Sequence, residues 1–141
     1  MNTLQVQLKS IDDKVKFSSV SRQNDEVITD YFPPFGTGEG YTPLELILIS
    51  LSSCLGTVLL TLIRGKMQKE IISYKTNATG IIKEEHPKAF SQIDLELIIE
   101  SKDVEESDIE RALYAAEEKL CPVWAMIRGN VKVNVTYKII R

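Results

Sequence analysis

Two cysteines are the residues of this chain with the greatest capacity for chemistry. Cys54 lies within a long apolar segment, and Cys121 directly precedes a proline. A thiolate is a strong nucleophile, and two thiols that meet can form a disulfide and so exchange electrons with a substrate. Free cysteine is also among the most buried residue types and often only fills space. Two interpretations are therefore open, a redox pair and two inert core residues.

Cys54 is expected to lie on a long helix. Residues 46–63 contain no charged side chain. Just before them, Thr42 and Glu45 form the sequence pattern of a capping box, with Thr42 as the N-cap and Glu45 as the third helical residue. The helix is expected to end near residues 64–66, where two cations and a glycine favour a C-terminus. Within it, small side chains that would let a narrow ligand or another backbone approach recur at helical spacing: Ser50, Cys54, Thr57 and Thr61.

The uncharged segment has the minimum length of a membrane span. Its serines and threonines dilute its hydrophobicity, and a span here would leave an N-terminal piece of about 40 residues that could hardly fold alone. We therefore expect no membrane partner. A helix that is apolar on nearly every side is otherwise buried in a core or at a subunit interface, and in a chain this short a second subunit is expected to supply part of the cover.

Cys121 is expected between two helices. Residues 107–119 carry apolar side chains at helical spacing, and Pro122 must end that helix and suits the first position of another over 123–128. The sulfur would then face free N–H groups and the positive end of a helix dipole. This setting predicts a lowered pKa and makes Cys121 the more acidic of the two thiols. The alternative is a cysteine that acts only as a weak N-cap.

Glu45, Arg22 and His86 are the other polar candidates. Glu45 stands nine residues before Cys54, which places the two on opposite faces of a straight helix, so capping is its simplest role. Arg22 lies in a polar loop, where most arginines are solvated. His86 is the only histidine, precedes Pro87 in a charged turn and has no partners at metal-ligand spacing, so no metal is expected.

The order of elements indicates an α+β fold with antiparallel sheets packed on the long, buried central helix. Length favours a single domain over residues 1–141. The net charge of −3 and the scattered basic residues argue against a nucleic-acid partner. Neither a secretory leader nor a disulfide framework is evident, so the cytoplasm is the expected compartment. The predicted strands cover residues 3–9, 14–18, 27–32, 73–83, 91–99 and 130–140.

Three separated motifs stand out in the same order along the chain. The first leads to Cys54, the second is a charged turn, and the third surrounds Cys121. They are Gly38-Glu39-Gly40-Tyr41-Thr42-Pro43-Leu44-Glu45-Leu46 leading to Ser53-Cys54, then Glu84-Glu85-His86-Pro87-Lys88-Ala89-Phe90, and then Glu117-Glu118-Lys119-Leu120-Cys121-Pro122-Val123-Trp124-Ala125-Met126-Ile127. Together they resemble the OsmC/Ohr family, and the agreement of three motifs makes the resemblance specific.

The resemblance implies an intertwined α+β homodimer with the long helix enclosed and the sites near the subunit interface. It also implies a thiol peroxidase that acts on organic hydroperoxides, with Cys54 as the peroxidatic thiol and Cys121 as the resolving one. Cys54 would be oxidised to a sulfenic acid, Cys121 would condense with it to a disulfide, and a dithiol would reduce that disulfide. No metal, flavin or haem cofactor is implied.

One position departs from the family's pattern. Well-characterised peroxidase members carry a glutamate that pairs with an arginine near the first cysteine, whereas here Leu44 stands at that position and Glu45 follows it. Through the resemblance, Glu45 and Arg22 are predicted to join Cys54 and Cys121 in the site. The alternative function is a non-enzymatic dimeric protein that binds a small hydrophobic ligand in the same interface cavity.

Overall fold

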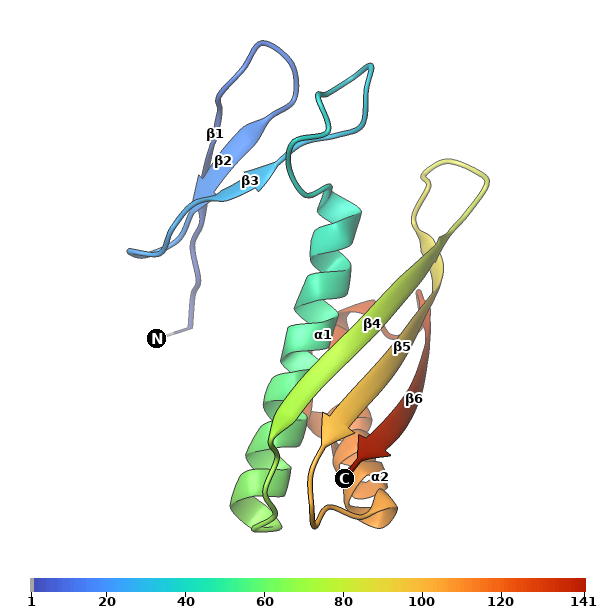
Figure 1. Cartoon of the computed structure of the whole chain (residues 1–141). Coiled ribbons are helices and arrows are strands. Elements are labelled where there is room, and N and C mark those ends of the chain that lie inside the picture. The colour runs from blue at the N-terminus through green and yellow to red at the C-terminus, as the bar shows by residue number, and fades with distance from the viewer. Residues whose placement is uncertain (1) are drawn as a thin grey trace. The chain divides into compact units, whose positions relative to one another are not determined.

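The computed structural model of the protein describes residues 2–141 (Figure 1). The chain forms two compact units, one that ends at Ile47 and one over Leu48–Arg141. The long helix α1 (Pro43–Thr61) belongs to both, because the boundary falls within it. The expectation of a single domain over the whole chain stays a prediction.

The N-terminal unit contains a small antiparallel sheet with the strand order β1-β2-β3. The predicted hairpin turn is confirmed, because the Asp12 carboxylate accepts hydrogen bonds from the N–H groups of Lys14 (2.9 Å) and Lys16 (3.1 Å). This bend takes up the start of the second predicted strand, so the strands are shorter than the alternation predicted. They are β1 (Gln7–Ser10), β2 (Phe17–Val20) and β3 (Val27–Thr29).

A buried aspartate organises the loop after β3. Asp30 is 2% exposed, and its oxygens accept hydrogen bonds from the Thr37 hydroxyl and from the N–H groups of Tyr31, Thr37 and Glu39. These bonds, the one from the Thr37 hydroxyl first, hold the pKa of Asp30 well below its usual range. A glycine is required at position 36, since a Cβ there would lie 2.3 Å from Asp30 Oδ1. A carboxylate therefore shapes this loop.

The N-terminal unit buries no apolar side chain within residues 2–47. Every buried apolar residue of the described chain lies at or beyond Leu51. Large apolar side chains are instead exposed along this unit, among them Leu4, Val6, Phe32 and Phe35. The apolar side chains of this unit are therefore more exposed than those of the C-terminal unit, which holds the buried core.

Helix α1 begins with the predicted capping box. The N–H of Thr42 donates to Glu45 Oε1 at 2.7 Å, and the N–H of Glu45 donates to Thr42 Oγ1 at 3.4 Å. The helix continues directly into a π-helical turn, η1 (Leu62–Lys66). One face is fully buried, through Leu51, Leu55, Leu59 and Ile63. Ile49 is 47% exposed, so a single chain does not enclose the helix on all sides.

The C-terminal unit contains a second sheet with the strand order β4-β5-β6. The predicted hairpin is confirmed, with β4 (Ser73–Ile82) antiparallel to β5 (Phe90–Glu100). The last strand, β6 (Lys132–Ile140), pairs with β5 in the parallel direction. The fold class α+β is confirmed, but the expectation that the sheets are antiparallel throughout was wrong for this pair.

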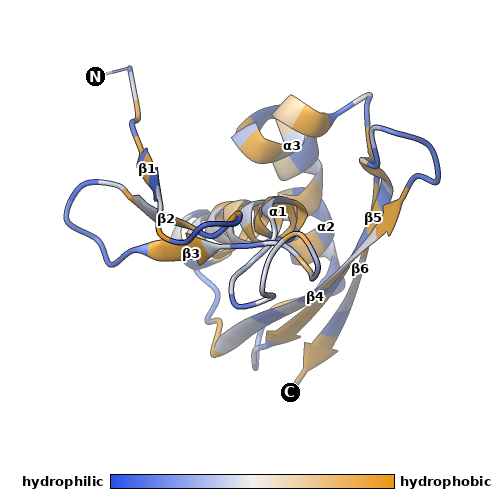
Figure 2. Cartoon of the chain, turned by 90° about the horizontal axis from the view of Figure 1, so that it is seen from above, coloured by the Kyte–Doolittle hydropathy of each residue, from blue (hydrophilic) through white to orange (hydrophobic). Residues whose placement is uncertain are grey.

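The helices between β5 and β6 explain the parallel pairing. A strand can return beside its predecessor in the same direction only through a long crossover, usually a helical one. Here the crossover contains α2 (Glu106–Ala115), a π-helical turn η2 (Ala116–Leu120) and α3 (Pro122–Ile127). Figures 1 and 2 place α1 and α2 against the same face of this sheet.

The inner face of the sheet carries the core. Ile93, Leu95, Leu97 and Ile99 of β5 are all buried, whereas Asp94 and the other alternate residues are partly exposed on the outer face. The sequence predicted this alternation of apolar and polar residues. The alternation also sets the register of the sheet, because a shift by one residue would turn the apolar side chains to the outer face. Helix α1 runs along this face of the sheet (Figures 1 and 2), which places the turn that carries Cys54 over it.

A buried carboxylate fixes the start of α2. Asp108 is 4% exposed, accepts a hydrogen bond from the N–H of Glu105 at 2.9 Å, and forms ion pairs with Lys69 (3.1 Å) and Arg111 (2.8 Å). These contacts, the Glu105 N–H first, hold the pKa of Asp108 below its usual value of 3.8. We expect Asp108→Ala to lower the free energy of unfolding by about 2 kcal/mol, because it removes a helix cap and charge-assisted hydrogen bonds.

Urea denaturation of the wild type and of Asp108→Ala measures this loss, and Glu84→Ala in an exposed turn is the control. Because the folded pKa is lowered, the contribution of Asp108 is complete above the unfolded value and is lost as the pH falls through the folded one. The difference between the wild type and Asp108→Ala should therefore narrow below about pH 4. A difference that stays constant from pH 7 to pH 3 would contradict the assignment.

Candidate functional site

Cys54 lies in the middle of α1 and is partly exposed. Leu51 and Leu55, its neighbours on the buried face, are fully covered by the core. Of the small side chains that flank it along the helix, Ser50, Ser53 and Thr57 are exposed. The thiol therefore lies at the border between the core and the open side of the helix, where small side chains leave room for an approaching molecule.

Cys121 lies at the junction between η2 and α3 and is 2% exposed. Its N–H donates to the carbonyl oxygen of Ala116 at 3.0 Å, which closes the π-helical turn, and its own carbonyl accepts from the N–H of Ala125 at 3.0 Å. Pro122 takes the first position of α3, as predicted. Both backbone groups of Cys121 are thus engaged in helix ends, so the position of its sulfur is well defined.

The fold brings the two sulfurs together within the C-terminal unit. Both cysteines are free thiols, and they lie close enough for the Cys54 side chain to raise the pKa of Cys121. Cys54 lies on α1 and Cys121 at the junction of η2 and α3, and 66 residues separate them in the sequence. A contact between thiols from distant segments is the arrangement from which a disulfide can form without rearranging the fold.

Burial dominates the electrostatics of Cys121. It raises the pKa of the Cys121 thiol to about 11, with a further increase from the Cys54 side chain. The N–H groups of Trp124 and Val123 lower the pKa, although the sulfur makes no regular capping hydrogen bond to α3. The predicted acidity of Cys121 was therefore wrong, because desolvation outweighs the favourable amides at the start of a six-residue helix. Cys121 is a neutral thiol at physiological pH.

A tyrosine that sequence reasoning missed lies beside the thiol pair. The hydroxyl of Tyr74, on β4, donates to the carbonyl oxygen of Ser52 on α1 at 3.0 Å. Its ring lies against Gly56, where a Cβ would come within 2.6 Å of the ring. Burial first, and then repulsion from the Cys121 thiolate that forms at high pH, raise the pKa of Tyr74 to about 12. The sequence contained one indication of this contact, which is Gly56. A glycine inside a helix lowers its stability, so it usually has a packing reason such as a close neighbouring side chain.

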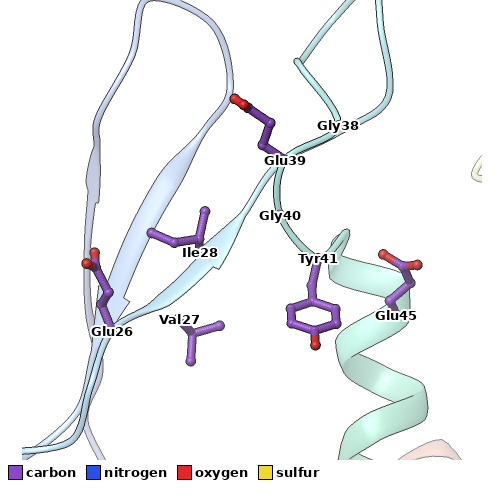
Figure 3. A pocket seen from close by; sticks show the side chains of 8 residues that line it. All are labelled: Glu26, Val27, Ile28, Gly38, Glu39, Gly40, Tyr41 and Glu45. Carbon is purple, nitrogen blue, oxygen red and sulfur yellow. The ribbon is translucent and has the colours of Figure 1, made fainter.

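Glu45 is engaged in the cap of α1 in the N-terminal unit. Its Oε1 also accepts from the Thr42 hydroxyl at 3.0 Å. Figure 3 shows Glu45 on the first turn of the helix, beside a pocket of about 600 Å³ whose rim also carries Glu26 and Glu39. The three carboxylates point away from one another instead of toward a common centre. The capping role is confirmed, and a role for Glu45 beside Cys54 stays a prediction.

Arg22 lies in the turn between β2 and β3. It is exposed and takes the left-handed backbone conformation, with φ of 57°. Like Glu45, it belongs to the N-terminal unit, whereas both cysteines belong to the C-terminal unit. Of the four predicted site residues, the structure therefore brings together Cys54 and Cys121, and the place of Arg22 in the site stays a prediction.

Within residues 2–141, no group of three or more His, Cys, Asp or Glu side chains is arranged to hold a metal ion. His86 is exposed in the hairpin between β4 and β5. The thiol pair is thus the constellation of this chain with the clearest chemical capacity, and that capacity is the reversible exchange of two electrons between dithiol and disulfide.

The chain belongs to the OsmC-like protein family, whose sequence profile matches residues 36–136. Protein YhfA of Escherichia coli (strain K12) is 23% identical over 99 residues, which cover 70% of this chain and 73% of YhfA. The OsmC/Ohr family includes peroxidases.

Solved structures share the fold over nearly the whole chain. A hypothetical protein from Aquifex aeolicus VF5 has a TM-score of 0.85 at 26% identity, covering 99% of this chain and 97% of that one. An OsmC-like protein from Mycoplasma pneumoniae has a TM-score of 0.82 at 20% identity, covering 100% of both chains. The organic hydroperoxide resistance protein OhrB of Bacillus subtilis has a TM-score of 0.65 at 20% identity, covering 96% of this chain and 98% of OhrB.

The segment Pro43–Lys66 is long and apolar enough, by length and composition, to cross a membrane. This is weak evidence, because the core helix of a soluble protein meets the same criterion. OsmC-like proteins are soluble, and in this chain the helix contributes one face to the core. The interpretation as a core helix therefore stands.

The cap of α1 gives a direct test of what Glu45 does. We expect Glu45→Ala to lower the free energy of unfolding by about 1 kcal/mol, because it leaves the N–H of Thr42 without its partner. Glu45→Gln is the matched control, since an amide oxygen accepts the same hydrogen bond. Chemical denaturation of the three proteins measures the effect. Equal destabilisation by both substitutions would show that the charge of Glu45, and not its cap, matters.

Proposed function

We propose that this protein is a thiol peroxidase that reduces organic hydroperoxides through Cys54 and Cys121. The observation that carries the proposal is the proximity of two free thiols, one on α1 and one between η2 and α3, which is close enough for Cys54 to raise the pKa of Cys121. Membership of a family that includes peroxidases supports it, as does the structural likeness to an organic hydroperoxide resistance protein.

The unequal environments of the thiols assign the order of events. Cys121 is buried and keeps its proton, so it can donate a hydrogen bond to the Cys54 sulfur and stabilise a thiolate there. Cys54 is the partly exposed thiol on the helix face with small side chains, where a hydroperoxide can reach it. Cys54 is accordingly the attacking thiol and Cys121 the resolving one.

The chemistry balances with these two residues. The Cys54 thiolate attacks the terminal peroxide oxygen, the O–O bond breaks, and the products are Cys54 sulfenic acid and an alkoxide that takes a proton to become an alcohol. The Cys121 sulfur then attacks the Cys54 sulfur, and the sulfenic hydroxyl leaves with the Cys121 proton as water. A dithiol reductant reduces the resulting disulfide by thiol–disulfide exchange and is itself oxidised to a disulfide.

Arg22 and Glu45 complete the proposed site. A guanidinium beside Cys54 would favour the thiolate, and a carboxylate would hold that guanidinium in place. Arg22 is exposed in the turn between β2 and β3, where a long side chain has room to move. Glu45 would orient it from the first turn of α1 while capping the helix.

Reaction with one equivalent of cumene hydroperoxide tests the proposal. Intact-mass analysis should show a loss of two hydrogens in the wild type, and peptide mapping should show a Cys54–Cys121 disulfide. Cys54→Ser should abolish peroxide consumption. Cys121→Ser should consume one equivalent and leave a sulfenic acid that dimedone traps. Arg22→Gln should slow the first step without changing the melting temperature. Unchanged peroxide consumption by Cys54→Ser would refute the role of Cys54.

We also propose that the protein works as an intertwined homodimer in the cytoplasm. The N-terminal unit exposes many apolar side chains and buries none within residues 2–47, and α1 leaves Ile49 exposed. A second copy of the chain would cover such surfaces, and stable interfaces bury on the order of 1,600 Å². This arrangement also accounts for the apolar composition of α1 on nearly every side.

Light scattering during size-exclusion chromatography tests the dimer. The expected mass is twice that of the 15.9 kDa chain. Ile49→Asp should shift the equilibrium toward monomer, because it places a charge on the exposed apolar side of α1. Ile82→Asp is the matched control, since Ile82 is 51% exposed at the end of β4. A wild type that is monomeric at micromolar concentration would defeat this part of the proposal.

A binding function is the second candidate, and one observation favours it. The N-terminal unit contains an apolar pocket of about 390 Å³ whose lining includes Phe17, Tyr31 and Phe35. If this is the function, the wild type and Cys54→Ser should bind cumyl alcohol equally, and the wild type should leave cumene hydroperoxide intact. The peroxidase proposal gives the opposite result in the second measurement.

A further inference from the structure

Tyr74 joins three elements at the thiol pair. It is the second residue of β4, lies opposite Ile99 of β5, and shares the inner face of the sheet with the core. From there its hydroxyl donates to the Ser52 carbonyl oxygen on α1, and it lies near enough to Cys121 for a thiolate there to raise the pKa of the phenol. One side chain thus contacts the helix turn that carries Cys54 and lies near Cys121.

The contact with α1 is made to the helix backbone itself. In an α-helix the Ser52 carbonyl is the acceptor for the N–H of residue 56, and its second lone pair is free for another donor. Tyr74 supplies that donor, and its ring occupies the space that a side chain at Gly56 would take. Cys54 lies midway between these two points of contact, so the ring and hydroxyl of Tyr74 hold the turn that carries the thiol.

We propose that Tyr74 is a positioning residue that keeps the Cys54 sulfur within bonding range of Cys121, an inference that rests on the proposed two-cysteine cycle. Tyr74 need not touch the peroxide for this role. Disulfide formation requires the sulfurs to approach to about 2.05 Å with a restricted Cβ–Cβ separation. The rate of such a step depends steeply on alignment, and a misplacement of about 1 Å can cost about 100-fold.

The proposal separates the two steps of the cycle. Attack of Cys54 on the peroxide needs an accessible thiolate and does not need Cys121 within bonding distance. Condensation of the sulfenic acid with Cys121 needs both sulfurs in register. Loss of the Tyr74 hydroxyl should therefore slow the second step and spare the first.

Single-turnover reaction of Tyr74→Phe with cumene hydroperoxide is the test. We expect peroxide consumption within about twofold of the wild type, disulfide formation slowed at least about tenfold, and a sulfenic acid that dimedone traps in higher yield. Tyr137→Phe is the matched control, because it removes one tyrosine hydroxyl, bonded to Glu110 at 3.0 Å on the edge strand β6, without touching the thiol pair. Disulfide formation by Tyr74→Phe at the wild-type rate would overturn the proposal.

A second variant approaches the same contact from the helix. Gly56→Ala places a methyl group where the ring of Tyr74 lies, so it should displace the ring and slow disulfide formation in the same way. Alanine favours the helix by about 1 kcal/mol over glycine, which opposes any general unfolding. Melting temperatures of both variants identify a loss of fold, and a slow second step in a variant that melts near the wild type supports the positioning role.

Equilibration with oxidised and reduced dithiothreitol distinguishes failure of this inference from failure of the peroxidase proposal. The oxidised reagent takes two electrons from the Cys54 and Cys121 thiols and becomes the reduced dithiol, so no peroxide is needed. Tyr74→Phe should lower the equilibrium constant for forming the protein disulfide by at least about tenfold, and Tyr137→Phe should not change it. If the wild type forms the disulfide here but ignores peroxide, only the peroxidase proposal fails. If both tyrosine variants match the wild type, the positioning role fails.

Discussion

The close approach of β4 to α1 is the packing constraint on which the candidate site depends. A helix normally keeps its backbone away from a neighbouring sheet by the thickness of its own side chains. At Gly56 there is no side chain, and the Tyr74 ring occupies the space instead. Interiors are packed closely enough that adding even one methyl group here would displace the ring or the helix. The position of the helix over the sheet, and with it the position of Cys54, follows from this contact.

The same packing gives the two thiols different properties. Cys121 lies within the crossover, between η2 and α3, where burial keeps it neutral, while Cys54 is partly exposed on α1. A pair of identical groups in unequal surroundings can divide a reaction between them, since the exposed thiol can meet a substrate while the buried one keeps its proton.

Local patterns in the sequence predicted most of the elements, because their causes are local. The capping box at Thr42 and Glu45, the hairpin at Asp12, and the alternation along β5 depend only on neighbouring residues. The direction of β6 could not be read in this way. Its parallel pairing depends on how far the crossover helices carry the chain, which is a property of the whole unit.

The candidate site was predictable only where it depends on local sequence patterns. The position of Cys121 ahead of a helix was correct, but the direction of its pKa shift was not, because burial is set by distant segments that no local pattern reports. No sequence pattern distinguishes Tyr74 from the other residues of its strand. Its contact with α1 depends on Gly56, 18 positions earlier in the sequence. Sequence reasoning found the reactive atoms, and tertiary packing determines their environment.

The crossover that contains Cys121 also governs when the thiol pair can exist. These helices are anchored between β5 and β6 (Lys132–Ile140), and β6 follows them in the sequence. On the ribosome the crossover therefore gains its second anchor only after β6 has emerged and paired with β5. A nascent chain displays Cys54 long before its partner is in place. The capacity for oxidation by peroxide followed by internal closure thus arises only after this sheet has formed, which ties reactivity to successful folding.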